Sequence, residues 1–172
     1  REWDPTPEAM REDFDWNHVP GTTVRLGVHP SAAYNRGTSS FAGGAGTPWG
    51  GACGFVLEPA AGDFVARKSY FFFERGFLAM GSGIRSTADH PEPIVTTVAQ
   101  WAAPEPNLPL RLSGDREVRE IDGEAAWDDV AWAWHDGVGY LFPEPVSLHG
   151  KRRGRLTTLW LDHGSAPDGA TY

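Results

Sequence analysis

The chain has 172 residues, which suits one domain or one large part of a bigger fold. Hydrophobic residues make up 40% and charged residues 22%, so a core can form and wholesale disorder is excluded. The net charge of −8 argues against a nucleic-acid partner, because neutralising phosphates requires clustered Lys and Arg. The one basic cluster, residues 151–155, is interpreted as a solvated turn.

Residues 7–14 are predicted to form one or two helical turns, and helical periodicity then disappears. The whole chain is rich in Gly and Pro, with 21 and 14 residues. Runs of β-branched and aromatic residues lie between Gly, Pro and Asp, which is typical of strands. These runs cover residues 22–28, 51–59, 63–74, 76–84, 93–101, 131–142 and 156–164. The pattern predicts an all-β fold, a layered antiparallel β-sandwich.

The sequence DWNHVPGTT, residues 15–23, raises the first question of function. Pro20 and Gly21 predict a type II turn, with Gly at the position of positive φ. Asn17 and His18 could belong to a polar cluster beside a cleft, with His18 as a base. The alternative is that Asp15 and Asn17 bond backbone amides around the turn while Trp16 packs beneath it.

The glycine-rich segment 41–55 carries Trp49 and has neither the spacing nor the lysine of a phosphate-binding loop. It is interpreted as a long loop in which Trp49 could stack on a sugar ring, or as a wide hairpin connection. The single cysteine, Cys53, excludes an internal disulfide and fits a packed core thiol. No histidine or acidic cluster has metal-ligand spacing, so no metal site is predicted.

Two hairpins are predicted further along the chain. Residues 70–73 are apolar on both faces, so all four side chains are expected to be buried between sheets, and this strand turns back at residues 74–76. Asp136-Gly137 predicts a second, tight turn. Four aromatic residues around this second turn are expected to share one sheet face: Trp132, Trp134, Tyr140 and Phe142.

The sequence also bears on the compartment and the completeness of the chain. No apolar run approaches the ~20 residues that a membrane-spanning helix needs, so no membrane partner is predicted. The first ten residues are charged and polar, unlike a signal peptide, which fits a cytoplasmic protein or a mature or excised segment.

Asp162, His163 and Ser165 do not form a hydrolase triad, because neighbouring residues of a strand point to opposite faces and no GxSxG motif is present.

An ordered series of motifs resembles the central β-sandwich domain of polysaccharide lyase family 8, which comprises hyaluronate, chondroitin AC and xanthan lyases. The motifs are DWxxVPGTT at 15–23, FAGG at 41–44, ARKSYFFFE at 66–74, MGSGI at 80–84, VTTVAQ at 95–100, GVGYLFPEP at 137–145 and LWLDHGSAPDGATY at 159–172. The resemblance implies a bacterial, secreted enzyme with a helical toroid and a multilayered β-supersandwich. Such enzymes use no organic cofactor.

The resemblance also implies a reaction, β-elimination on an acidic polysaccharide. A polar side chain neutralises the uronate carboxylate, a His or Tyr removes the neighbouring proton, and a Tyr protonates the leaving glycosidic oxygen. The product carries a C4–C5 double bond. The family's catalytic Asn, His, Tyr and Arg lie in the helical toroid, and nothing in this chain resembles that toroid. No catalytic residue is therefore assigned here.

The predicted organisation is one β-sandwich segment over residues 1–172, incomplete at both ends and without the catalytic toroid. Its expected role is to scaffold the toroid and to form part of the substrate cleft, with Asn17, His18 and Trp49 as cleft residues. The expected partners are an acidic polysaccharide and the toroid of the same protein. The alternative is a non-catalytic carbohydrate-binding β-sandwich. Exposed Trp residues would favour this alternative, and buried Trp residues would favour the scaffold.

Overall fold

The computed structural model describes residues 13–27, 37–60, 62–105 and 107–172, so the helical turns predicted over residues 7–14 lie largely outside the described residues. The chain divides into two compact units. Unit 1 comprises Arg1–Thr22 and Thr96–Asp162, and unit 2 comprises Thr23–Val95 and His163–Tyr172. The described residues form twelve strands in two antiparallel sheets, which confirms the predicted all-β sandwich class.

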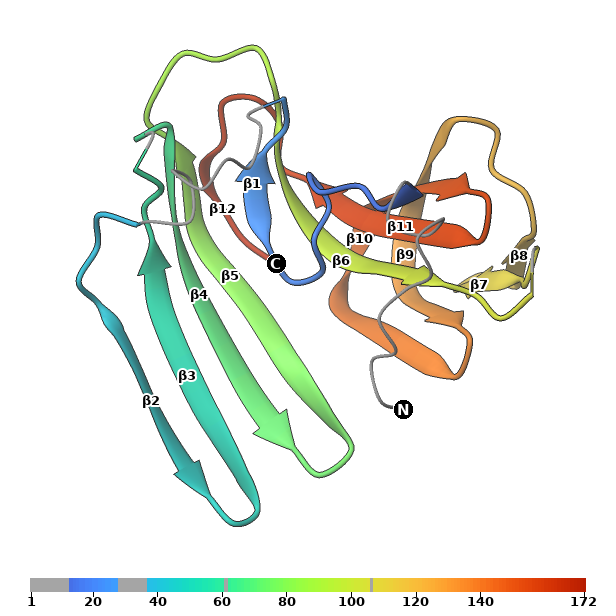
Figure 1. Ribbon diagram of the computed structural model, residues 1–172, viewed down its shortest axis with the longest axis horizontal. Coiled ribbons are helices and arrows are strands. Elements are labelled where there is room, and N and C mark those ends of the chain that lie inside the picture. The colour runs from blue at the N-terminus through green and yellow to red at the C-terminus, as the bar shows by residue number, and fades with distance from the viewer. Residues whose placement is uncertain (1–12, 28–36, 61, 106) are drawn as a thin grey trace. The chain divides into compact units, whose positions relative to one another are not determined.

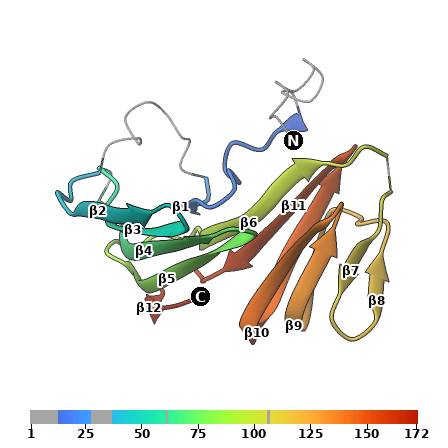
Figure 2. The same ribbon diagram turned by 90° about the horizontal axis from the view of Figure 1, so that it is seen from below.

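The larger sheet has seven strands in the order β1-β6-β11-β10-β9-β7-β8 (Figure 2). Strand β1 and the first two residues of β6 belong to unit 2, and the remainder of the sheet belongs to unit 1. The strand bounds are β1 (Thr23–Arg25), β6 (Ile94–Ala102), β7 (Leu110–Leu112), β8 (Arg116–Val118), β9 (Glu124–His135), β10 (Val138–Arg153) and β11 (Leu156–Asp162).

The second sheet lies in unit 2 and has five strands in the order β12-β5-β4-β3-β2 (Figure 1). The bounds are β2 (Ala42–Thr47), β3 (Gly50–Leu57), β4 (Phe64–Phe73), β5 (Gly76–Ser86) and β12 (Asp168–Ala170). Its core contains Phe64, Ala66, Ile84 and Ile94, with Tyr172 packed against them. The core therefore lies near the start of β4, far from the β4–β5 turn.

Unit 1 has its own core around β11, whose first six residues are all buried. A strand that is buried on both faces appears in the sequence as a continuous apolar or β-branched run, and LTTLWL is such a run. The other fully buried aliphatic side chains of this unit include Leu110, Leu112, Val130 and Leu148.

The hairpin at Asp136-Gly137 is confirmed, but the predicted aromatic face is wrong. Both turn residues have positive φ, +45° and +80°, as a two-residue type I′ turn requires. A two-residue turn pairs Trp134 with Gly139 and Tyr140 with Ala133. Because directly paired residues share a face, the two tryptophans lie on one side of the sheet and Tyr140 on the other.

The glycine-rich segment is a tight hairpin of two strands, which corrects the predicted long loop. Strand β2 pairs with β3 across a two-residue turn, Pro48-Trp49. A Cβ added at Gly50 would lie 2.5 Å from the carbonyl oxygen of Phe72, and one at Gly44 would lie 2.9 Å from that of Ala52. Glycine is therefore required here by close strand packing, and not by a flexible loop.

The predicted burial of residues 70–73 is also wrong. Tyr70 is half-buried, and Phe71, Phe72 and Phe73 are exposed, Phe73 to 63%. These residues form the end of β4 next to a two-residue turn, Glu74-Arg75, and their neighbours on β3 are the small residues Gly51 and Ala52. Nothing among the described residues covers this end of the sheet as the core covers the other.

Candidate functional site

The turn at Pro20-Gly21 has the predicted type II form. The Thr22 amide donates to the Val19 carbonyl oxygen over 3.1 Å, and Gly21 has φ +80°. The turn is fixed to β6 on both sides, since the Gly21 amide donates to the Thr97 carbonyl and the Thr97 amide donates to the Thr22 carbonyl. The segment before the turn is thus held as an extension of the sheet in unit 1.

Gly21→Ala is expected to destabilise the chain by about 1 kcal/mol, because a side chain is disfavoured at positive φ. Space is not the cause, since nothing lies within 4 Å of the Cβ position. Urea unfolding followed by far-UV circular dichroism measures the difference. Gly139→Ala is the control, as that glycine lies in the same unit and has no positive φ. Equal losses in the two variants would show that the turn conformation is not the cause.

The carboxylate of Asp15 organises the segment before the turn. Its Oδ1 accepts the Asn17 amide over 2.9 Å, and its Oδ2 lies 2.7 Å from Lys151 Nζ. Burial raises the pKa of Asp15, but the Lys151 hydrogen bond and charge and the Asn17 amide outweigh it, so the pKa is lowered overall. Asp15 therefore bonds the backbone around the turn and pairs with a lysine of β10.

Gln100 on β6 attaches the same segment to the sheet, and sequence analysis did not single it out. Its side-chain Nε2 donates to the carbonyl oxygens of Asp15 and His18 over 3.0 and 2.8 Å, and its Oε1 accepts the Asp15 amide over 2.8 Å. A buried amide with these three bonds satisfies backbone groups that would otherwise be orphaned. The only sequence signal was a polar residue within an apolar strand.

His18 is 2% exposed and lies inside unit 1. Its Nδ1 is 3.2 Å from Thr97 Oγ1, and its ring lies 4.6 Å from the Trp160 ring. Burial first, and then the charge of Lys151, lower the pKa of His18 to about 4. The ring is therefore neutral at pH 7, and its 4.0 Å approach to the Asp15 carboxylate is not an ion pair at that pH.

The remaining predicted cleft residues have different surroundings. Asn17 is half-buried beside His18, and Trp16 is 61% exposed with its ring 4.9 Å from Phe14, so Trp16 does not pack beneath the turn. Trp49 is 87% exposed at the β2–β3 turn of unit 2. The assignment of Asn17, His18 and Trp49 to a substrate cleft stays a prediction.

A second histidine cluster of unit 1 was missed from the sequence. The Trp101 indole N–H donates to His135 Nδ1 over 2.7 Å, which leaves the ring proton on Nε2. Arg152 lies 3.5 Å from that Nε2, but two donors cannot bond each other, and Arg152 instead donates to the Leu108 carbonyl oxygen. Burial, and then the Arg152 charge, lower the pKa of His135.

Two buried cations of unit 2 were also missed. The Arg25 guanidinium donates to the Asp63 carboxylate and to the carbonyl oxygens of Asp63, Glu92 and Ser165, and also to Ser86 Oγ. Lys68 Nζ donates to Thr23 Oγ1 over 2.8 Å and lies 5.1 Å from the Tyr172 ring centre. Burial lowers the pKa of Lys68 to about 8. Both side chains join segments that are distant in sequence.

The described ranges contain neither a metal-binding cluster nor a membrane-spanning helix. No group of three or more His, Cys, Asp or Glu side chains there could hold a metal ion. No helix in that part of the chain is long and apolar enough to cross a membrane.

Comparison with known proteins decides the family. The family model described as polysaccharide lyase family 8, super-sandwich domain, matches residues 12–156. The chain belongs to polysaccharide lyase family 8. It is 30% identical to a chondroitinase-AC of Pedobacter heparinus over 92% of this chain and 25% of that protein. It is 32% identical to a xanthan lyase of Bacillus sp. strain GL1 over 71% of this chain and 16% of that protein.

The fold of this family 8 chain is likewise similar to a solved lyase. A Paenibacillus xanthan lyase structure matches with a TM-score of 0.80 and 26% identity, over 92% of this chain and 18% of the other. The chain thus spans a quarter or less of the length of these relatives. The family assignment predicted from the ordered motifs is confirmed.

Proposed function

We propose that these residues form the central β-sandwich part of a secreted lyase that cleaves an acidic polysaccharide, namely hyaluronan, chondroitin or xanthan, by β-elimination. The family match over residues 12–156 carries this proposal. The names of the relatives support the substrate class, since one is a chondroitinase and another a xanthan lyase.

Within that enzyme, the proposed role is to scaffold the helical catalytic domain and to form one wall of the substrate cleft. Large apolar side chains gather at the exposed end of the unit 2 sheet, including Trp49, Phe72, Phe73 and Phe77. Apolar patches of this kind are uncommon on free-standing soluble proteins and mark surfaces that contact another protein or domain. A domain of the same protein is the partner we propose.

Three titratable side chains of this segment are poorly suited to proton transfer with a substrate. β-Elimination needs a base and an acid that both reach the substrate and titrate near the working pH. The two histidines with shifted pKa values, His18 and His135, are buried and hydrogen-bonded. Burial raises the pKa of Tyr140 to about 12, so its hydroxyl stays protonated at neutral pH and the basic phenolate is hardly populated.

We expect the 172-residue chain alone to show no lyase activity. The chain is incubated with hyaluronan, chondroitin and xanthan, and the ultraviolet absorbance of the unsaturated product is followed. The positive control is the longer protein that contains this segment together with a helical domain. Product formed by the 172 residues alone, and lost in a His18→Gln variant, would overturn the scaffold proposal and make His18 a base.

A second candidate is a carbohydrate-binding module without catalysis. The exposure of Trp49, Trp132 and Trp134 favours it, because exposed indole rings can stack on sugar rings. A polymer-binding measurement added to the activity assay separates the two functions. Polymer binding that is lost in Trp49→Ala, combined with no activity in the longer protein, would support the binding module instead.

A further inference from the structure

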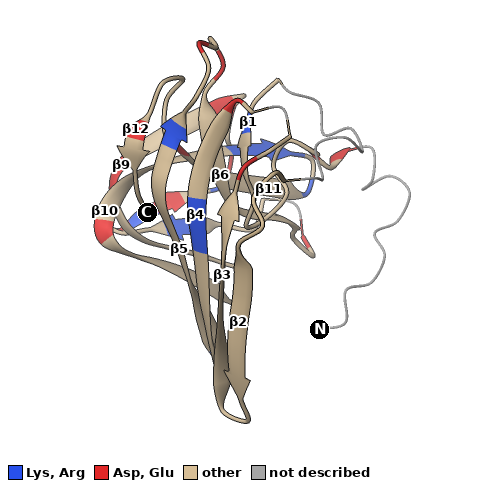
Figure 3. Cartoon of the chain, turned by 90° about the vertical axis from the view of Figure 1, so that its left-hand side faces the viewer, with Lys and Arg blue, Asp and Glu red and all other residues tan. Residues whose placement is uncertain are grey.

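Charged residues are unevenly distributed in the five-stranded sheet of unit 2. Strands β2 and β3 carry none, whereas Arg67, Lys68, Arg85 and Asp168 all lie on β4, β5 and β12 (Figure 3). Lys68 is buried on the inner side, so Arg67, Arg85 and Asp168 make up the exposed charge of these strands. The exposed charge of this sheet is positive, although the chain as a whole carries −8.

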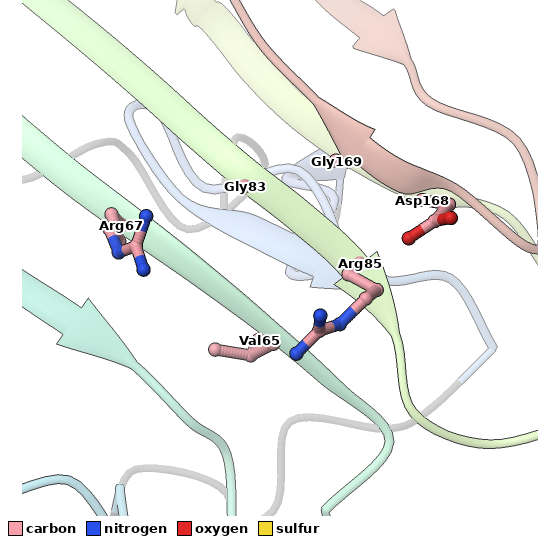
Figure 4. Close-up of a pocket in the computed structure, with 6 residues that line it drawn as sticks. All are labelled: Val65, Arg67, Gly83, Arg85, Asp168 and Gly169. Carbon is pink, nitrogen blue, oxygen red and sulfur yellow. The ribbon is translucent and has the colours of Figure 1, made fainter.

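A hollow lies between these three side chains. It has a volume of about 160 Å³ and is lined by Val65, Arg67, Gly83, Arg85, Asp168 and Gly169 (Figure 4). Pockets that enclose a drug-sized ligand have about 300–1,000 Å³. This hollow is therefore suited to one charged group of a ligand and not to a whole oligosaccharide.

Two β-bulges explain why the hollow exists. Strand β5 carries one extra residue opposite β4, because Val65 pairs with Arg85 while Arg67 pairs with Ser82. Strand β12 carries one extra residue opposite β5 at Gly169. Gly83 and Gly169 have φ +60° and +95°, as glycines at bulges often do. Gly83 and Gly169, which have no side chains, form the floor of the hollow, and the side chains of Arg67, Arg85 and Asp168 surround it.

Neither guanidinium has a hydrogen-bond or ion-pair partner among the described residues. Arg67 and Arg85 make no hydrogen bond or ion pair with any described residue, in contrast to Arg25, Arg116 and Arg155, which donate to carbonyl groups. Arg85 pairs across the strands with Asp168, but no ion pair joins them within 4.0 Å. The Arg67 guanidinium lies over the floor, with Nη1 3.7 Å from the Cβ position of Gly83.

We infer that Arg67 and Arg85 form a binding site for an oxyanion of an acidic polysaccharide, either a uronate carboxylate or a sulfate ester. Guanidinium groups present paired donors that match the geometry of both groups. The same sheet face continues along β4 to Ser69 and Phe71 and along β5 to Met80 and Leu78. Their exposed apolar surface would take the C–H faces of neighbouring sugar rings.

The choice of polymer rests on the proposed function, whereas the site itself lies in unit 2 and is proposed for binding only. It would hold a polysaccharide on the β-sandwich. Loss of this site would leave elimination possible, and loss of elimination would leave this site intact.

Titration of the 172-residue chain with size-defined oligosaccharides tests the inference. Backbone amide shifts of Gly83 and Gly169 are followed by NMR, and affinity is measured by calorimetry. Hyaluronan oligosaccharides carry carboxylates only, chondroitin sulfate carries both groups, and a neutral dextran oligosaccharide carries neither. Inorganic sulfate is added as a competitor. Binding of both acidic oligomers identifies the carboxylate, and binding of chondroitin sulfate alone identifies the sulfate ester.

Substitutions of exposed residues provide the decisive comparison of binding affinities. Arg67→Gln combined with Arg85→Gln should weaken binding by about tenfold or more, because charge-assisted hydrogen bonds are lost. Asp168→Asn should strengthen binding by roughly twofold, since a like charge is removed. Arg75→Gln, an exposed arginine at the β4–β5 turn of the same sheet, should have little effect.

Two outcomes would overturn the site. The first is no shift at Gly83 and Gly169 with either acidic oligosaccharide. The second is an equal loss of affinity in the double variant and in Arg75→Gln, which would indicate nonspecific attraction. Lyase activity of the longer protein is measured separately on the same variants, so that failure of the proposed function is distinguished from failure of this site.

Discussion

Arg25→Met is expected to lower the free energy of unfolding by about 3–5 kcal/mol, because it leaves a buried carboxylate and several buried carbonyl groups without their donor. The side chain is fully buried and bonds Asp63, Glu92, Ser86 and Ser165, which come from four separate segments of unit 2. A loss of this size is comparable with the whole stability of many domains. Urea unfolding and hydrogen exchange of unit 2 amides measure it.

Arg153→Met is a matched control for this experiment. Arg153 Nε lies 3.2 Å from the Asp13 carboxylate, almost the same distance as the 3.1 Å between Arg25 Nε and Asp63. The Arg153 side chain is 72% exposed, so its loss should cost under about 1 kcal/mol. Arg25→Lys should remain clearly destabilised, because an ammonium group cannot replace the planar donor fork. Similar small losses in all three variants would refute a structural role for Arg25.

The second large effect is expected as a function of pH. The pKa of His18 is about 4 in the folded chain and 6.5 as its ordinary value. The unfolded chain therefore binds a proton between these pH values that the folded chain does not bind. The contribution of His18 to the free energy of unfolding should be complete above pH 6.5. It should decrease by about 3 kcal/mol as the pH falls toward 4.

Other groups around His18 do not reverse this sign. Lys151 opposes protonation, whereas the charges of Asp15 and Glu124 favour it without restoring the ordinary pKa. The lowered pKa of His135 adds to the same loss, whereas the lowered pKa of Asp15 acts only below its ordinary value of 3.8.

Denaturation at several pH values, followed by tryptophan fluorescence, tests this expectation. Seven of the eight tryptophans lie within unit 1, so Trp49→Phe makes the signal specific for that unit. In this background His18→Gln should be less stable at pH 7 but should lose less stability between pH 6.5 and 4. The same slope with and without His18 would show that this histidine is not the acid-sensitive group.

The sequence predicted most of the strands because their apolar and β-branched runs are bounded by turn residues. The Pro20-Gly21 turn and the Asp136-Gly137 hairpin were predictable for a local reason, since each needs positive φ at a glycine. The aromatic face was not, because one residue in the register of a hairpin exchanges the two faces. Trp132 pairs with Leu141, and not with an aromatic residue.

Other errors have a common physical origin in contacts between distant segments. Gly44 of β2 and Gly50 of β3 resemble loop residues until the neighbouring carbonyl groups are placed against them. Phe71–Phe73 is apolar on both faces, but the sequence of a strand does not tell whether a second layer covers it. The partners of Arg25 and Gln100 lie up to 140 and 85 residues away, so no local pattern indicated them.

Strand β2 has a consequence for handling the protein in solution. It is a terminal strand of its sheet, all six of its residues are exposed, and AGGAGT contains no charge and no proline. Natural sheets usually protect such borders with lysine, proline or a bulge, because the unpaired amide and carbonyl groups can template another strand. The 172-residue chain should therefore self-associate through this border at high concentration. Gly46→Lys should reduce this association, because nothing lies within 4 Å of the Cβ position of Gly46 and a lysine fits there.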